Sequence, residues 1–135
     1  MGIRVRPWQR DDLPAAARIL RVSWLAAYGG LVPEADLKGY LDATYRIDVL
    51  GRLYESAFIH GYMGECGDQA VGYARTQFHR SENRLYLASL YLLPAFQGRG
   101  IGGRLLAAAE EKALAYGLHD LWVGVMMQNA AARGW

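Results

Sequence analysis

Four glycines lie close together in LLPAFQGRGIGGRLL, residues 92–106, between an apolar segment and a helix-forming one. They are Gly98, Gly100, Gly102 and Gly103, with Arg99 among them. A glycine within a helix is less favourable than an alanine by about 1 kcal/mol, so the cluster needs a compensating purpose. The first turn of a helix offers free main-chain N–H groups and the positive end of the helix dipole, which a bulky anion can approach past glycine. The pattern therefore predicts a phosphate-binding turn, and a turn used only for tight packing is the alternative.

A dinucleotide is one anion to consider, because Gly98-x-Gly100-x-x-Gly103 satisfies the fingerprint G-x-G-x-x-G. That fingerprint belongs to the opening turn of a βαβ unit, with an acidic residue about 20 positions further on. Here the cluster comes late in the chain and Asp120 precedes the next apolar segment, so a dinucleotide-binding domain is disfavoured. A P-loop is excluded because no Lys-Ser or Lys-Thr follows the glycines.

The first half of the chain predicts one strand and several helical turns that would lie beside this turn. Alternation in IRVRPW predicts a short strand near the N-terminus, and apolar residues at helical spacing predict a helix over residues 12–28. Gly29 ends that helix. Residues 33–56 form a second helical region, in which Gly39 and Gly51 argue against one continuous rod.

The second half predicts the sheet. The segments AFIHGY, QAVGYARTQF and RLYLASLYLL are strands, and the short connections GECGD and HRSEN make them an antiparallel meander. A helix through Tyr116 follows the glycine cluster, Gly117 ends it, and LWVGVMM is a further strand. This order predicts a parallel pair beside the meander. The expected fold is α+β, a mixed sheet with helices on both faces, in a single domain over residues 1–135.

Composition limits the classes of function. The 135 residues are 53% apolar and 21% charged, which is typical of a globular domain, and the net charge of +2 is too small to indicate a nucleic-acid partner. Cys66 is the only cysteine, and no segment has the length of a signal peptide core or a membrane span. We expect a cytoplasmic protein with no membrane partner. His60, His79 and His119 lack metal-ligand spacing, so no metal is expected.

In the register Gln97-x-x-Gly100-x-Gly102, the glycine cluster resembles the acetyl-CoA-binding motif of the GCN5-related N-acetyltransferases. Pro94 after the strand and the leucine pair in the helix match as well. LWVGVMMQNAAARGW and the opening RPWQRDDLPAAARIL also resemble family segments, so the resemblance covers nearly the whole chain. Within the family, YLDATYRIDVL and LWVGVMMQN are most similar to bacterial polyamine acetyltransferases.

This resemblance implies acetyl-CoA as the cosubstrate. Main-chain N–H groups of the glycine turn would hold the pyrophosphate, and the pantetheine arm would pair with the preceding strand as an extra strand does. The N–H near Leu92 would stabilise the oxyanion. Asn129 would contact the cofactor arm, although a helix N-cap explains it equally well. The residues implied in cofactor binding are Leu90, Tyr91, Leu92, Gln97, Gly98, Arg99, Gly100, Ile101, Gly102, Gly103 and Asn129.

The implied reaction is direct attack of a small-molecule primary amine on the thioester, with a polyamine as the narrower candidate. Many family members carry a glutamate on the last meander strand or on the next strand, whereas this chain has Tyr86 and Ser89, and then Gly124. Tyr86 and Ser89 are therefore the candidate catalytic residues, and a packed aromatic is the alternative for Tyr86. Waters held by backbone carbonyls, or Glu34 or Glu82 as the base, stay open.

Two aromatic residues at the end of the first helix, Trp24 and Tyr28, are the candidate substrate-binding residues. Such rings hold a cationic amine by cation–π contact, and Glu34, Asp36 or Asp42 would supply charge. The alternative places Trp24 in the hydrophobic core.

The family's general acid is a tyrosine seven residues after the asparagine, which here falls just beyond Trp135. We therefore expect a chain truncated at its C-terminal end, or one that takes its closing elements from a partner in a homodimer. Without that tyrosine, the truncated chain would bind cofactor better than it turns over. The competing hypothesis is a non-catalytic acyl-CoA-binding or regulatory module that uses the same turn.

Overall fold

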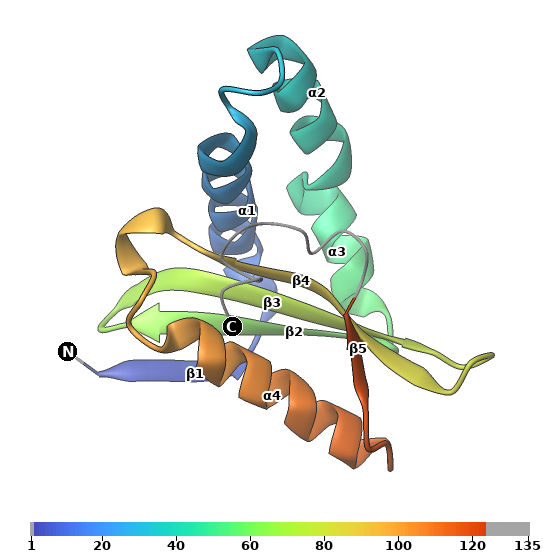
Figure 1. Cartoon of the computed structure of the whole chain (residues 1–135). Coiled ribbons are helices and arrows are strands. Elements are labelled where there is room, and N and C mark those ends of the chain that lie inside the picture. The colour runs from blue at the N-terminus through green and yellow to red at the C-terminus, as the bar shows by residue number, and fades with distance from the viewer. Residues whose placement is uncertain (1, 124–135) are drawn as a thin grey trace.

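The computed structural model describes residues 2–123 and places one five-stranded sheet between helices (Figure 1). The strands lie in chain order, and the first four are antiparallel while the fifth runs parallel to the fourth. The predicted α+β fold with a mixed sheet is confirmed. The strands are β1 (Ile3–Pro7), β2 (Ile59–Cys66), β3 (Gln69–His79), β4 (Arg84–Leu92) and β5 (Leu121–Val123).

Helices cover both faces of the sheet, as predicted. On one face α1 and α3 pack against the strands and α2 extends away from them, while α4 crosses the opposite face (Figure 1). Two short 3-10 turns, Arg10–Asp12 and Pro94–Phe96, precede α1 and α4. The helices are α1 (Leu13–Tyr28), α2 (Glu34–Thr44), α3 (Ile47–Glu55) and α4 (Ile101–Ala115).

Close packing fixes where α4 begins. Ile101 and Leu105 are fully buried and face Gly64 on β2 and Gly72 on β3. A Cβ at Gly64 would lie 2.9 Å from Ile101 Cγ2, and one at Gly72 would lie 2.7 Å from Leu92 Cδ2. Because only glycine leaves this space, the first turn of α4 sits directly on the sheet.

The helical region over residues 33–56 is divided, but not at its glycines. Gly39 lies inside α2 and Gly51 inside α3, and the two helices are separated by the non-helical residues Tyr45 and Arg46. Each helix buries leucines on the side toward the core, including Leu37 on α2 and Leu50 on α3. This burial outweighs the helix propensity that each glycine costs, about 1 kcal/mol.

One predicted boundary also shifts. GECGD was expected to be a connection, but β2 continues through Glu65 and Cys66, which pair with β1 and β3. The turn itself is Gly67 and Asp68, and Gly67 has the positive φ of 63° that a tight turn requires. Of the strand predicted over residues 121–127, the described residues include only β5.

Candidate functional site

Among the described residues, β5 pairs with only the first part of β4. Leu85, Tyr86 and Leu87 lie opposite β5 residues, and Ala88 is then an extra residue in the ladder with β3, a β-bulge. From there to Leu92, no described strand pairs with this side of β4.

Main-chain donors therefore point outward from this edge. The N–H of Leu93 donates to Val71 O on β3 at 2.8 Å, and alternation along a strand directs the N–H of Leu92 the other way. Ser23 of α1 donates its hydroxyl to Leu92 O at 3.2 Å, which fixes that end of the strand. Leu90, Tyr91 and Leu92 are all buried, so their side chains hold the strand while its backbone faces the edge.

A run of unpaired main-chain N–H groups stands at the start of α4. Gln97 donates its N–H to Pro94 O at 3.4 Å, and Arg104 donates its N–H to Gly100 O at 3.2 Å. Between these two residues, the N–H groups from Gly98 to Gly103 have no partner among the residues that the structure describes. No acidic residue stands in the first turn of α4. The turn thus presents donors and the positive helix end together.

The glycine turn leaves room for a bulky ligand. Gly98 and Gly100 have positive φ values of 79° and 84°, and a Cβ on either would meet nothing within 4 Å. Ile101 and Gly102 are buried and anchor the turn from below. Arg99 is exposed, with its guanidinium 5.1 Å from the centre of the Phe96 ring.

One cavity of about 680 Å³ opens between α2, α3 and the sheet, beside the bulge of β4. We call it the Arg75 cavity. The rings of Tyr40 and Tyr45 form its helical wall, and Arg75 on β3 lies on its sheet side. Tyr86 and Ala88 connect it to β4, and Glu82 stands in the β3–β4 turn.

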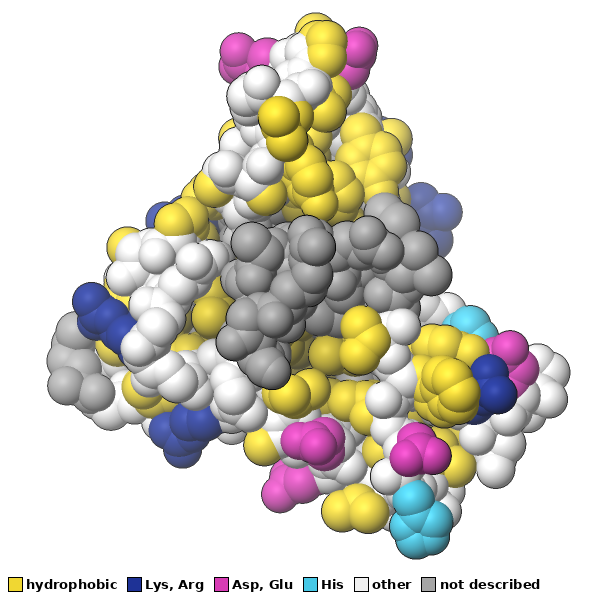
Figure 2. All heavy atoms as spheres, in the orientation of Figure 1, with side chains coloured by type: hydrophobic (Ala, Val, Ile, Leu, Met, Phe, Trp, Pro, Cys, Tyr) yellow, Lys and Arg dark blue, Asp and Glu magenta, His cyan; other side chains and the backbone are white. Residues whose placement is uncertain are grey.

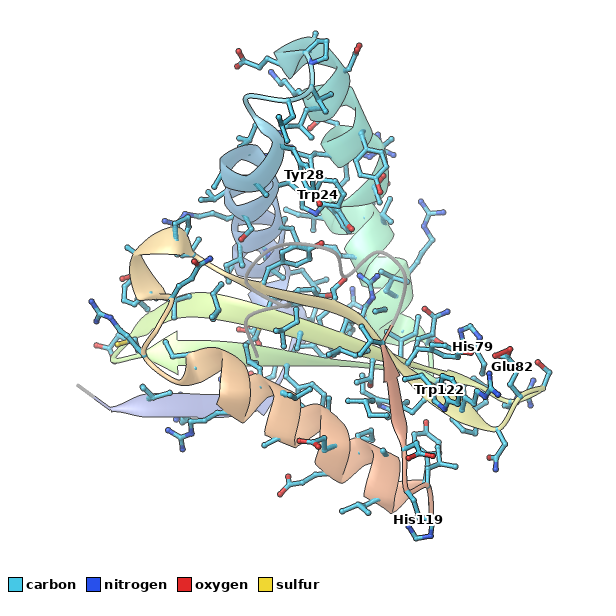
Figure 3. All side chains as sticks on the ribbon, in the orientation of Figure 1. Trp24, Tyr28, His79, Glu82, His119 and Trp122 are labelled. Atoms are coloured by element: carbon cyan, nitrogen blue, oxygen red, sulfur yellow. The ribbon has the colours of Figure 1, made fainter. Side chains whose placement is uncertain are left out.

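Glu82 joins two other polar side chains of this cavity. Tyr86 donates its hydroxyl to Glu82 Oε2 at 3.0 Å, and His79 Nδ1 lies 3.5 Å from the same oxygen. Figure 3 shows His79 and Glu82 together at the end of the sheet, near Trp122 of β5. The cluster places a carboxylate, a phenol and an imidazole in one wall, which is a set of groups that can accept or relay a proton.

A second cavity of about 420 Å³ lies between α1 and α2, and we call it the Trp24 cavity. Trp24 and Tyr28 line it with their rings 4.9 Å apart, and Tyr40 and Asp36 complete it (Figure 3). Hydrophobic side chains also gather on the surface over α1 and α2 (Figure 2). Trp24 is only 9% exposed, so it serves the core and the cavity wall at once.

Tyr45 and Tyr91, two of the tyrosines beside Trp24, are neutral at physiological pH. Burial raises the pKa of Tyr45 to about 12, an effect that Tyr40 increases and the charge of Arg75 opposes. Burial also raises the pKa of Tyr91, whose ring lies 6.4 Å from that of Trp24. These side chains therefore act as aromatic walls and hydroxyl donors, not as bases.

The structure brings some of the predicted residues together and separates others. Tyr86 and Glu82 are in direct contact, whereas Ser89 is buried at 1% exposure opposite Arg75. Glu34 stands exposed at the start of α2, and Asp42 pairs with Arg21, whose hydrogen bond lowers the pKa of that carboxyl. Asn129 and Gly124 lie outside the described residues.

Neither His79 nor Arg75 was predicted as a site residue from the sequence. A histidine beside a turn and an arginine inside a strand carry no spacing signal of their own. The one available signal was alternation on β3, which places Arg75, Gln77 and His79 on one face.

Two further observations concern ligand and membrane classes. Within residues 2–123, no group of three or more His, Cys, Asp or Glu side chains is placed to hold a metal ion. None of the helices described here combines the length and apolarity that crossing a bilayer requires.

Comparison with known proteins identifies the family. The family model for the acetyltransferase (GNAT) family matches residues 16–135, so the chain belongs to this family. A curated relative, an uncharacterized N-acetyltransferase from the pepI 3' region of Lactobacillus delbrueckii subsp. lactis, is 26% identical over 138 residues. The match covers 98% of this chain and 80% of the relative. The enzyme class predicted from the sequence, an acetyltransferase, is confirmed at this level.

Solved structures share the fold. The PaiA N-acetyltransferase of Thermoplasma acidophilum, crystallised with coenzyme A, superposes with a TM-score of 0.86 at 23% identity, over 99% of this chain and 86% of that one. An aminoglycoside acetyltransferase from an uncultured soil sample gives 0.71 at 18% identity, over 99% and 88%. The ribosomal-protein-S18-alanine N-acetyltransferase of Escherichia coli gives 0.69 at 19% identity, over 98% and 73%.

Proposed function

We propose that this chain transfers the acetyl group of acetyl-CoA to the primary amine of a small molecule. The observation that carries the proposal is the run of main-chain N–H groups from Gly98 to Gly103, which lack partners among the described residues, in a turn whose Gly98, Arg99, Gly100 and Gly103 are exposed. A diphosphate needs several donors and little side-chain bulk, and this turn offers both. The coenzyme A seen with the PaiA protein supports the choice of ligand.

The donors of β4 suit the rest of the cofactor. The edge from Ala88 to Leu92, with which no described strand pairs, would accept an extended amide chain as a further strand, and it leads from the glycine turn toward the Arg75 cavity. The N–H of Leu92 is the donor we assign to the thioester oxygen, where negative charge develops during attack.

Glu82 is the group we assign as the final acceptor of the amine proton, which waters in the Arg75 cavity would carry to it, because Tyr86 lies about 20 Å along β4 from Leu92. A free alkyl amine has a pKa near 10, so at neutral pH it must lose a proton before it attacks. Glu82 already accepts a hydrogen bond from Tyr86 and lies beside His79, and all three side chains line the Arg75 cavity. Tyr86 thereby acts as the link between the carboxylate and β4.

The fold alone does not define the acceptor. The proteins that share it include an aminoglycoside acetyltransferase and a ribosomal-protein-alanine N-acetyltransferase. A polyamine is the candidate that the sequence suggested. The aromatic rings and Asp36 of the Trp24 cavity favour an alkyl ammonium, whereas the guanidinium of Arg75 repels one. A homodimer also stays a prediction, which sedimentation velocity would test.

Release of free thiol from acetyl-CoA, measured over a panel of small amines, tests this function. We expect amine-dependent release, together with coenzyme A binding by calorimetry. Binding of coenzyme A without turnover of any amine would favour the non-catalytic module. Thermal stabilisation by NAD but not by coenzyme A would instead indicate that the glycine turn binds a dinucleotide.

A further inference from the structure

Arg75 is a partly buried cation that lacks a counter-ion in the described part of the chain. Its Nη1 donates to the hydroxyl of Tyr73 at 3.4 Å, while its Nε is buried and has no hydrogen-bond partner there. None of the ion pairs formed among the described residues includes Arg75. The edge of the guanidinium formed by Nε and Nη2 is therefore without a protein acceptor in this region.

An unpaired donor on a half-buried cation is costly unless a ligand completes it. Two neighbouring N–H groups of a guanidinium match the two oxygens of a carboxylate, with which they form parallel hydrogen bonds. Because Arg75 lines a cavity of about 680 Å³, such a ligand has room to enter.

The positive and negative groups of the cavity lie at different places along the sheet. Arg75 lies opposite Ser89 in the β3–β4 ladder, whereas Glu82 and His79 stand at the β3–β4 turn. Neighbouring strands are about 4.8 Å apart, so a molecule a few bonds long reaches from β3 to the open edge of β4. A cation at one place and an anion at another complement a ligand that carries both charges.

We propose that Arg75 binds the carboxylate of an acceptor that carries a primary amine and a carboxylate in one small molecule, namely an amino acid. This assignment rests on the proposed function, because it names the acceptor of the same site. The carboxylate pairs with the guanidinium of Arg75, and the amine lies toward β4. A polyamine meets the guanidinium with like charge and is disfavoured.

Matched acceptors test the assignment with the unaltered chain. Thiol release from acetyl-CoA is measured with 4-aminobutyrate and butylamine, with β-alanine and propylamine, and with spermidine. We expect the carboxylated member of at least one pair to have a kcat/KM about 10- to 100-fold above its partner. An equal or higher kcat/KM for butylamine, propylamine or spermidine would overturn the assignment, and this comparison needs no variant to fold.

Variants then locate the effect. Arg75→Gln should raise KM for the carboxylated amine about 10- to 100-fold, with kcat and the KM of the uncharged partner little changed. Arg75→Lys keeps the positive charge but loses the paired N–H donors of the planar guanidinium, so its KM should be intermediate. Arg80→Gln is the matched control, because Arg80 is exposed and stacks 4.7 Å from the Phe58 ring, and the cavity lining does not include it.

Calorimetry without acetyl-CoA separates this assignment from the proposed function. Arg75-dependent binding of 4-aminobutyrate, in the absence of any turnover, would support the carboxylate site and reject transfer. Turnover of amines with no preference for a carboxylate, or an unchanged KM in a folded Arg75→Gln variant, would reject the carboxylate site and leave transfer standing.

Discussion

Polar groups are treated in opposite ways at the start of α1, where Arg6 lies, and at two other places, the start of α4 and the Arg75 cavity. At the start of α1, Arg6 donates to both oxygens of Asp12 at 2.7 and 2.8 Å and to Glu65 at 3.2 Å. Asp12 in turn accepts the main-chain N–H of Gln9 at 2.7 Å. We call this region the Arg6 corner.

The start of α4 and the Arg75 cavity show the reverse. Six successive main-chain N–H groups from Gly98 to Gly103, and the Nε of Arg75, have no acceptor among residues 2–123. A fold that pairs its polar groups so completely at one helix start leaves them open at the other. This difference fits a stabilising role for the Arg6 corner and supports the proposal that the open donors bind ligands.

The largest effect that would sharpen this comparison is expected at Gly100. Gly100→Glu should weaken coenzyme A binding about 100-fold or more, because it adds a negative charge where phosphate binds and a side chain at a positive φ. Calorimetry with coenzyme A measures the change.

Gly117→Glu is the matched control for that variant. Gly117 has a φ of 77° and equally open space, but it follows the C-terminal end of α4. It shares the strain and the added charge, so coenzyme A affinity should stay within about 2-fold of the unaltered chain. Equal losses in the two variants would show that strain, and not phosphate contact, explains the result.

The next largest effect concerns the base. Glu82→Gln removes the carboxylate that accepts from Tyr86, and we expect kcat to fall about 100-fold while coenzyme A affinity is unchanged. Glu110→Gln, on the exposed side of α4, should leave kcat as it was. A folded Glu82→Gln variant with full kcat would remove Glu82 from the mechanism.

The Arg6 corner predicts a loss of stability without a loss of acceptor binding. Arg6→Gln leaves Asp12 and Glu65 with fewer donors and should lower the free energy of unfolding by about 2 kcal/mol, measured by urea titration. Arg46→Gln breaks the exposed pair with Asp48 and should change it by less than about 0.5 kcal/mol. If Arg6→Gln instead raised KM at unchanged stability, the two regions would not differ as described.

The smallest effect is a pH dependence at the same corner. Hydrogen bonds from Arg4 and then Arg6 hold the pKa of Glu65 below its ordinary value of 4.5. The stability that Glu65 contributes is therefore full above pH 4.5 and is lost as the pH falls through the lowered pKa.

The difference in unfolding free energy between the unaltered chain and Glu65→Gln checks this. It should be largest at pH 7 and shrink toward about pH 2.5. A difference that does not vary with pH would mean that Glu65 contributes by packing and not by charge.

The sequence by itself determined the class of the fold and the presence of a glycine-rich turn with free main-chain N–H groups before a helix. Alternation and helical spacing are local signals, so they identified the strands of the meander and the limits of α1 and α4. Four glycines before a helix are also a local signal, since their main-chain N–H groups belong to that turn whatever surrounds it.

Only the tertiary structure decided which distant side chains meet. Arg75 and Glu82 are candidate site residues because they line one cavity, whose walls come from α2, α3, β3 and β4. No spacing of residues along the chain predicts that cavity. Gly39 and Gly51 stayed inside helices because burial of neighbouring leucines outweighs local propensity. Whether a polar group is paired or left open depends on residues far away in sequence, and that is what separates the Arg6 corner from the site.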